Sequence, residues 1–495
     1  MSVQLVWLKR DLRIADHRPL VDAARQGPVA LVYVFEPDLW AEPEYDASHL
    51  AFVLECLDDL DEALAPLGAR VLRRVGRVRE VFDALGRFWT EQGGIGGLHS
   101  HQETGVLWTY ARDRRVKRWC RHHGVPWTEA VQDGVERGPS TRDGWAARWK
   151  RFVRQPTVPV PDALPTPPLP PDDPETHTFD GLREALGLPP TTIDERQAGG
   201  ATTGQAWLDS FLRRRVATYA SGMSSPVTAG ESCSRLSTYL AWGALSQKQV
   251  VQRLDQFERA RPKLAEGYAA FRSRLAWRSH FVQKLEDEPE IEVRSLDPAV
   301  DRVRPDRGFD PGRLEAWMRG ETGYPMVDAC MRALARTGWI NFRMRAMVVS
   351  FSSYHLWQPW QAPAKALARH FLDFEPGIHY PQFQMQSGTT GINSLRIYDP
   401  VKQVRDQDPQ GRFIRRWVPE LAGVPDAHLA EPHRMSAPEQ DAAGCRIGVD
   451  YPAPLVENKP AIAKARRVLE ALRRRPESRA RSREVFQRHG SRRRR

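Results

Sequence analysis

The chain has 495 residues, of which 41% are hydrophobic and 27% are charged, a composition that is typical of a globular protein and excludes a disordered one. This length accommodates two domains, and no apolar run approaches the roughly 20 residues of a membrane-spanning helix. The net charge of +11 favours a polyanionic partner such as nucleic acid, although residues 492–495 contribute part of it as a solvated basic end.

The first residues and the cysteines indicate the compartment. The short apolar run at 2–8 leads directly into the charged run at 9–13, which reverses the order of a signal peptide. The five cysteines are scattered and form no Cys-x-x-Cys pair, which argues against a disulfide framework, a zinc site and an iron–sulfur cluster. We therefore expect a cytoplasmic protein without a bound metal. We also expect a monomer that does not associate with membranes.

Short apolar runs alternate with helix-like stretches over residues 1–135. The pattern predicts strands at 4–8, 29–35 and 69–72, and helices at 17–25 and 50–64. Strands separated by helices predict a parallel, Rossmann-like α/β sheet with right-handed crossovers. The glycine-rich run 93–97 lacks the third glycine of a dinucleotide-binding loop, because position 99 is histidine, and we interpret it as a turn before a strand.

The composition and hydrophobic pattern of the sequence change twice after this domain. Nine prolines between positions 156 and 174 exclude a helix or a central strand, so we expect a Pro-rich interdomain linker over 136–203. Long periodic stretches then predict an all-α domain over 204–475, and a basic tail should follow over 476–495. The expected helices of this part are 207–219, 237–257, 264–285, 313–336, 345–356 and 460–474.

A dense polar cluster lies at the start of one predicted helix. It contains Ser234, Arg235 and Ser237, with Leu236 between them. The first amides of a helix lack partners and the helix dipole favours negative charge, so this segment is a candidate anion site. Helix capping is the alternative, but it explains one serine and not a cluster that includes an arginine.

Together with other segments, this cluster resembles the photolyase/cryptochrome family. The matching segments keep their order along nearly the whole chain, and they are 7–13, 233–246, 275–278, 314–329, 413–421 and 450–456. The chain is most similar to a divergent, prokaryotic-type, class I-like deoxyribodipyrimidine photolyase. The resemblance implies an antenna-type α/β domain followed by a helical domain that binds FAD.

The resemblance also implies a flavin site. The polar cluster should bind the pyrophosphate, and Arg345 should pair with Asp373 beside the isoalloxazine. A fixed guanidinium would stabilise a reduced, anionic flavin in a low-dielectric cavity, whereas a salt bridge that merely links helices is the alternative. The residues implied to bind the cofactor are Tyr219, Ser234, Arg235, Leu236, Ser237, Arg278, Arg345, Asp373 and Glu375.

The implied reaction is light-driven electron transfer from reduced FAD to a pyrimidine dimer in damaged DNA, with the damaged bases flipped out of the duplex. Trp277 would stack on the flipped dimer, although packing in a core is its alternative role. The implied catalytic residues are Trp277, Arg345, Asp373 and His379. The implied DNA contacts are Arg274, Trp277, Arg343 and Lys402. Trp317 and Trp360 match the outer and middle members of the family's electron-transfer chain, and both are also suited to packing.

Four positions depart from the family pattern. A glutamate that contacts the lesion is replaced by Arg274, and a His-Asn pair by the dipeptide 341–342. His379 aligns with the asparagine that faces flavin N5, and Phe383 aligns with the innermost tryptophan. Reduction of the flavin would then need Tyr380, Trp357 or an external reductant.

These departures leave other functions open. A cryptochrome-type blue-light receptor is the alternative to a repair enzyme, and a plain adenine-nucleotide-binding protein is a third. Residues 101–104 resemble a segment whose glutamate, here Glu103, contacts an antenna chromophore. The resemblance does not select the antenna, which would be a folate or a deazaflavin, and an empty antenna site is the other alternative.

Overall fold

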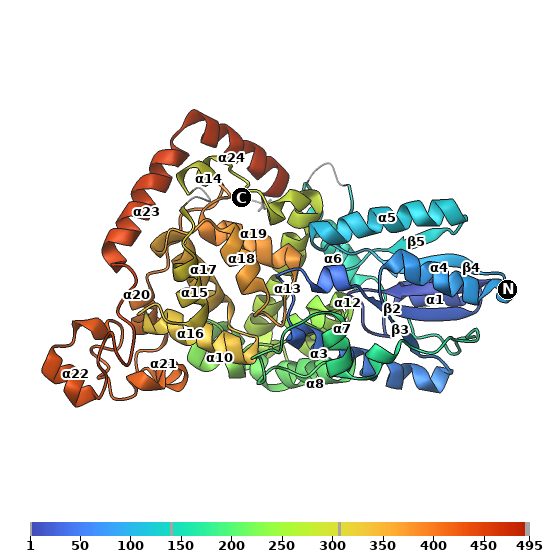
Figure 1. Cartoon of the computed structure of the whole chain (residues 1–495), viewed down its shortest axis with the longest axis horizontal. Coiled ribbons are helices and arrows are strands. Elements are labelled where there is room, and N and C mark those ends of the chain that lie inside the picture. The colour runs from blue at the N-terminus through green and yellow to red at the C-terminus, as the bar shows by residue number, and fades with distance from the viewer. Residues whose placement is uncertain (1, 139–141, 305–307, 491–495) are drawn as a thin grey trace.

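The computed structural model describes residues 2–138, 142–304 and 308–490. A five-stranded sheet with its helices occupies one side of the molecule, and a larger helical body occupies the other (Figure 1). The predicted division into an α/β part and an all-α part is therefore confirmed.

All pairs in the sheet are parallel, in the order β3-β2-β1-β4-β5. The strands are continuous apolar runs because both faces are covered. On one face, Val6 and Leu31 belong to the core that extends through the helical body, while Leu5 and Val32 face a second core under α4 and α5. The elements are β1 (Val3–Leu8), α1 (Arg18–Ala24), β2 (Val29–Phe35), α2 (Pro37–Trp40), α3 (Ala47–Leu64), β3 (Val71–Val75), α4 (Val78–Phe88), β4 (Ile95–His101), α5 (Leu107–His123) and β5 (Trp127–Ala130).

The expected linker is only partly irregular. Residues 155–173 form neither helix nor strand, as their prolines predict, and the carboxylate of Asp172 accepts a hydrogen bond from the backbone of Arg73 on the edge strand β3. Helices α6 (Trp145–Arg154) and α7 (Phe179–Ala185) lie in the same stretch. Trp149 of α6 donates to Gln247 at 2.9 Å, so α6 belongs to the helical body.

Two predicted helices are each broken into two. The stretch 237–257 forms α11 and α12, separated at Gly243, which has a φ of +69° and packs against the backbone of Arg10. The stretch 313–336 forms α15 and α16, because Gly320 ends the first in a left-handed conformation and Pro325 begins the second. The helical spacing of hydrophobic residues continues across both breaks, so the sequence pattern predicted one helix in each case.

The helical body contains the predicted helices and several others that were not predicted. They are α8 (Ala201–Ser210), α9 (Val216–Gly222), α10 (Pro226–Ser232), α11 (Ser237–Ala241), α12 (Gln247–Ala260), α13 (Ala265–Asp287), α14 (Ala299–Val303), α15 (Pro311–Arg319), α16 (Pro325–Thr337), α17 (Phe342–Ser350), α18 (Gln361–Ala368), α19 (Pro376–Ser387), α20 (Pro400–Gln407), α21 (Arg412–Trp417), α22 (Ala437–Ala443), α23 (Asn458–Arg473) and α24 (Pro476–His489).

The chain ends in a packed helix where a basic tail was expected. Helix α24 buries Val485 in the main core, and Ser482 donates to the carbonyl of Gly391 at 3.0 Å. Arg481 donates to the carbonyl of Leu296 at 2.7 Å. A helix over 476–489 was not predicted, because the segment has few apolar residues and many arginines, and its apolar periodicity is weak.

Candidate functional site

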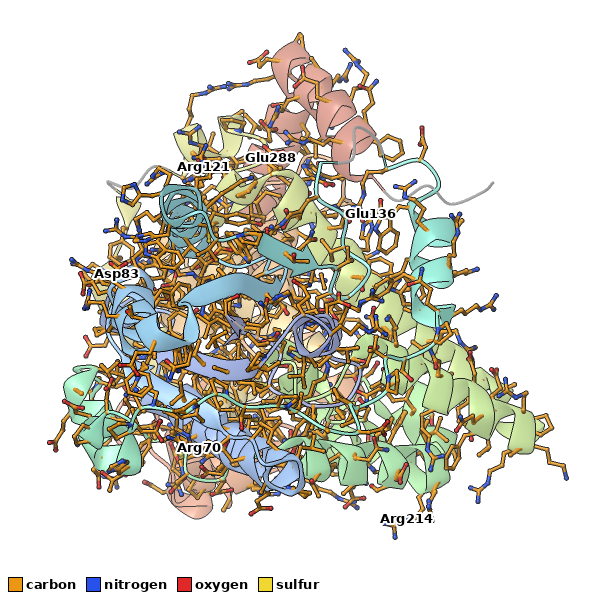
Figure 2. The ribbon with its side chains drawn as sticks, turned by 90° about the vertical axis from the view of Figure 1, so that its right-hand side faces the viewer. Arg70, Asp83, Arg121, Glu136, Arg214 and Glu288 are labelled. Atoms are coloured by element: carbon orange, nitrogen blue, oxygen red, sulfur yellow. The ribbon has the colours of Figure 1, made fainter. Side chains whose placement is uncertain are left out.

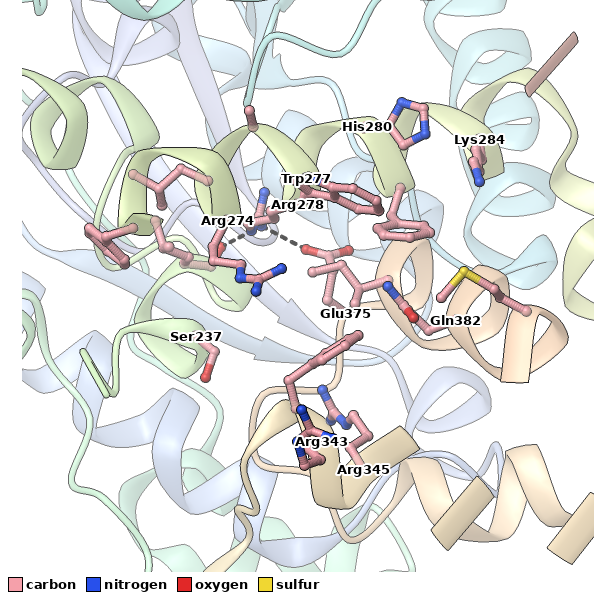
Figure 3. Close-up of a pocket in the computed structure, with 18 of the residues that line it drawn as sticks. Ser237, Arg274, Trp277, Arg278, His280, Lys284, Arg343, Arg345, Glu375 and Gln382 are labelled. Carbon is pink, nitrogen blue, oxygen red and sulfur yellow. Dashed lines mark hydrogen bonds and ion pairs between the residues drawn. The ribbon is translucent and has the colours of Figure 1, made fainter. Parts of the chain in front are cut away.

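A cavity of about 1410 Å³ opens in the helical body and extends to α6 and α24. It exceeds the roughly 300–1,000 Å³ of ordinary small-molecule sites. Helix α13 forms one wall with Trp277 and Arg278, and Arg343 and Arg345 of α17 lie across from it (Figure 3). The cavity is therefore large enough for a dinucleotide together with a second ligand.

The predicted anion site lines this cavity. Arg235 has a φ of +60°, a conformation that is uncommon for a residue other than glycine. Its guanidinium lies 4.0 Å from the ring centre of Trp339 and donates to Gln197 at 3.1 Å. Burial lowers the pKa of Arg235 to about 10, so its side chain stays charged at neutral pH. Ser234 and Ser237 thus face the cavity beside a fixed cation.

Tyr219 and Arg274 meet at the same end of the cavity. Burial raises the pKa of the Tyr219 hydroxyl, and the nearby positive charge of Arg274 opposes that rise. The ring of Tyr219 packs edge-on against Phe211 and Phe271, which fixes its position. Tyr219 and Arg274 both line the cavity.

Arg278 lines the cavity, but its donors are used within the protein. It pairs with Glu375 at 2.8 Å and Asp133 at 2.6 Å, and it donates to the carbonyl of Leu240 (Figure 3). Burial alone would lower the pKa of Arg278, but the two carboxylates raise it above its ordinary value. Since Asp133 follows the last strand of the sheet, this residue joins the two parts of the chain.

The ion pair expected from Arg345 and Asp373 is present, at 2.8 Å. The Arg345 guanidinium also lies 3.4 Å from the ring centre of Phe371. Its Nε atom is buried and has no hydrogen-bond partner among the described residues, and the same holds for Oε1 of Gln382. Both residues line the cavity, so unsatisfied polar atoms lie where a ligand would supply partners.

His379 does not line the main cavity, contrary to its expected place beside the cofactor. Its Nε2 atom is hydrogen-bonded to the carbonyl of Ala364 at 2.8 Å, and its ring packs edge-on against Phe374. Burial lowers its pKa to about 3, so the imidazole is neutral. The sequence analysis missed Gln382. Helical spacing from Ile378, which lines the cavity four residues earlier, is the signal that could have found it.

The mouth of the cavity carries exposed aromatic side chains. Trp277 is 40% exposed and Phe342 is 51% exposed. Asn341 lines the cavity, but its amide donates to the carbonyls of Met223 and Ser224. Lys402 does not contribute, because it lies on α20, outside the cavity lining, and pairs with Asp406 at 3.1 Å.

A cationic group at the far end of the cavity was also missed. Arg142 donates to His280 at 2.6 Å, and Lys284 lies beside them (Figure 3). Burial and the charge of Arg142 lower the pKa of Lys284 to about 7. Arg142 and Trp145 of α6 fall in the expected linker, which is why this part of the lining was not foreseen.

The two tryptophans of the expected electron-transfer chain are both buried. Trp360 donates to Ser295 at 2.8 Å, and its ring centre lies 6.4 Å from that of Phe383. Trp317 is 0% exposed and does not reach the surface, and its role as the outer member of the chain stays a prediction. Trp357, which is half-buried and lies 4.8 Å from the Lys464 ammonium, is a more accessible aromatic residue.

Glu103 is engaged within the α/β domain. Its carboxylate pairs with Arg112, which also pairs with Glu36 at 3.1 Å. The cavity that Glu103 lines has a volume of about 30 Å³. That cavity has room for about one water molecule.

Comparison with known proteins gives consistent matches. The family model described as DNA photolyase matches residues 4–135, and the one described as FAD binding domain of DNA photolyase matches residues 271–471. A cryptochrome DASH of Gloeobacter violaceus is 30% identical over 92% of this chain and 93% of its own length. A deoxyribodipyrimidine photo-lyase of Streptomyces griseus is 30% identical over 96% and 99%.

The fold agrees with these matches. A Synechocystis sp. cryptochrome structure superposes with a TM-score of 0.83 at 24% identity, covering 94% of this chain and 99% of that one. In the part of the chain that the structure describes, no helix has the length and apolar character needed to cross a membrane.

Proposed function

This chain belongs to the photolyase/cryptochrome family, and on that basis we propose that it repairs pyrimidine dimers in DNA by light-driven electron transfer from FAD. The observation that carries the proposal is the large cavity described above, which combines a candidate anion site, a partly buried Arg345–Asp373 pair and an exposed Trp277. A cofactor and a flipped base can both enter such a space.

The residues present fit FAD. Ser234, Ser237 and Arg235 form a cationic cradle suited to the pyrophosphate, because hydroxyl groups and a fixed guanidinium satisfy phosphate oxygens. The unpartnered polar atoms of Arg345 and Gln382 would be satisfied by the polar edge of the ring system. When bound, reduced and excited by light, FAD supplies the electron that opens the cyclobutane ring of the dimer.

The protein's own part is to hold charge and exclude water. Arg345, fixed by Asp373 and Phe371, would stabilise negative charge in a setting where screening by water is weak. The buried His379 stays neutral and therefore adds no competing positive charge. Trp277 offers a ring face at the mouth for stacking with an unpaired base.

A blue-light receptor is the second candidate, and one observation favours it. The position where family members contact the lesion through a carboxylate is occupied by the cationic Arg274, and the amide of Asn341 donates to the backbone carbonyls of Met223 and Ser224. Two polar contacts to a dimer would therefore be absent.

A light-dependent repair assay decides between the two. Reduced, FAD-loaded protein is mixed with an oligonucleotide that contains a cyclobutane dimer, and dimer loss is followed under blue light and in the dark. Loss of dimers only in light supports the repair enzyme. A photoactive flavoprotein that leaves both cyclobutane and (6-4) lesions intact would contradict it and favour the receptor.

A further inference from the structure

The positive charge of the chain is concentrated at its C-terminal end. Residues 458–495 contain 15 lysines and arginines and 3 acidic residues, whereas the other 457 residues contain 58 basic and 59 acidic ones. Apart from this segment the protein is therefore nearly neutral. Its net charge of +11 comes from residues 458–495, which include α23, α24 and the four arginines at 492–495.

One flank of α24 is held in place by ion pairs. Arg481 and Arg488 both pair with Glu288 at the end of α13, at 3.5 Å and 3.2 Å, and His489 bonds to the same carboxylate at 2.7 Å. Val485 and Ser482 complete the anchoring face. The helix is thus fixed beside the cavity, and Figure 2 shows it projecting at the top of the molecule with long side chains extending outward.

The opposite flank carries the residues that we call the arginine stripe: Arg475, Arg479 and Arg483. They are spaced by four residues, so they lie along one side of the helix. All three are exposed, and none has an ion-pair partner among residues 2–138, 142–304 and 308–490. Like charges at this spacing repel each other, so the stripe does not stabilise the helix.

The arginine stripe lies on the same side of α24 as a residue that lines the cavity. Phe486 follows Arg483 by three residues on the same side of the helix, and it lines the cavity together with Gly490. From Arg475 to Arg483 there are eight steps along the chain, which extend for roughly 12 Å along the helix axis. That length corresponds to about three or four phosphates of a strand that rises about 3.4 Å per nucleotide.

We infer that the arginine stripe binds the phosphate backbone of the DNA strand whose damaged base enters the cavity. The inference rests on the proposed function, since it names a further contact surface for the same substrate. Exposed, unpaired guanidinium groups in a row match a row of phosphates in charge and spacing, and they carry no sequence preference. Lys150, which is exposed on α6 and lines the same cavity, is available to the same strand.

The test compares two triple variants with equal loss of charge. The stripe variant is Arg475→Gln, Arg479→Gln, Arg483→Gln. The control variant is Lys459→Gln, Arg466→Gln, Arg467→Gln, which removes three exposed charges from α23, away from the cavity lining. Flavin content and thermal unfolding of each full-length, FAD-loaded protein establish that the fold is intact. The Kd for a dimer-containing oligonucleotide is then measured against salt concentration.

The stripe variant should reduce the slope of log K against log salt by about 2 to 3, because each lost phosphate contact removes about 0.7–0.9. The control variant should change the slope by less than about 1. The inference would be overturned if the two variants had equal effects, or if the stripe variant kept the wild-type slope. In a protein that still repairs dimers, either result would leave the proposed function intact. A wild-type protein that binds no DNA would overturn the proposed function as well.

Discussion

Two regions of the cavity, which we call the cofactor wall and the rim, differ in burial. The cofactor wall, formed by Ser234, Arg235, Ser237, Arg345 and Asp373, is partly or fully buried, and its two arginines are fixed by stacking and by hydrogen bonds. The rim, formed by Arg274, Trp277, Phe342 and Arg343, is more exposed, and it holds two of the four departures from the family pattern. The side chains where the cofactor would bind are therefore held in fixed positions. The departures from the family pattern at the rim lie where the substrate would bind.

The largest effect is expected on the cofactor wall, from Arg345→Ala. This change leaves the buried Asp373 without its partner, and breaking a buried pair costs roughly 3–5 kcal/mol. The variant should lose most of its FAD, measured as flavin absorbance per protein after gel filtration. Arg343→Ala, a neighbour on the rim side, should keep its flavin. Full occupancy in Arg345→Ala would show that the pair only links helices.

A pH effect should come from Lys284. Its pKa of about 7 lies below the ordinary value of 10.5, so between these values the unfolded chain binds a proton that the folded chain does not. The free energy of unfolding should therefore rise with pH across this window, by up to about 1.4 kcal/mol per pH unit. Lys284→Met should remove that contribution in denaturant titrations at pH 7 and pH 10. A pH profile identical to wild type would mean that the amine is solvated.

A moderate effect is expected at the rim, from Trp277→Ala. Losing one stacked base should weaken binding of dimer-containing DNA by about 1–3 kcal/mol and leave flavin content unchanged. Trp277→Phe, which keeps a ring face, should retain part of the affinity. Fluorescence anisotropy with damaged and undamaged oligonucleotides measures the difference. If damaged and undamaged DNA lost affinity equally, Trp277 would contribute to general binding and not to the lesion site.

The smallest effect is expected outside the cofactor wall and the rim, from Lys402→Gln. The side chain is exposed and pairs with Asp406 on the same helix, and such pairs contribute about 0.3–0.5 kcal/mol. DNA affinity should stay close to wild type, whereas Arg343→Gln should weaken it. A large loss in Lys402→Gln would extend the DNA-binding surface beyond the cavity mouth.

Much of the fold could be predicted because local patterns determined it. The buried strands are continuous apolar runs, and the prolines of 155–173 exclude regular structure. The helix breaks at Gly243 and Gly320 were missed because each depends on a close approach between distant segments, or on a left-handed glycine within an unbroken apolar period.

The parts of the site that depend on residue type were predicted. The parts that depend on the direction in which a side chain points from its helix were not. Arg345 and Asp373 meet as expected, because opposite charges on neighbouring helices pair. His379 was expected at the cavity and faces away from it, because one residue along a helix turns a side chain by about 100°. Ile378 and Gln382 face the cavity, and His379 faces the core. The burial of Trp317 likewise follows from packing between helices, which alignment to a motif does not reveal.

The Arg278 bridge has a consequence for unfolding. It ties Asp133, beside the sheet, to Glu375, at the start of α19, and the main core is continuous across the same boundary. A ligand that binds only the folded state stabilises every part that unfolds together with its site. Cofactor occupancy should therefore raise the melting temperature of the α/β part as much as that of the helical body. The two units distinguished along the sequence would then melt as a single cooperative one.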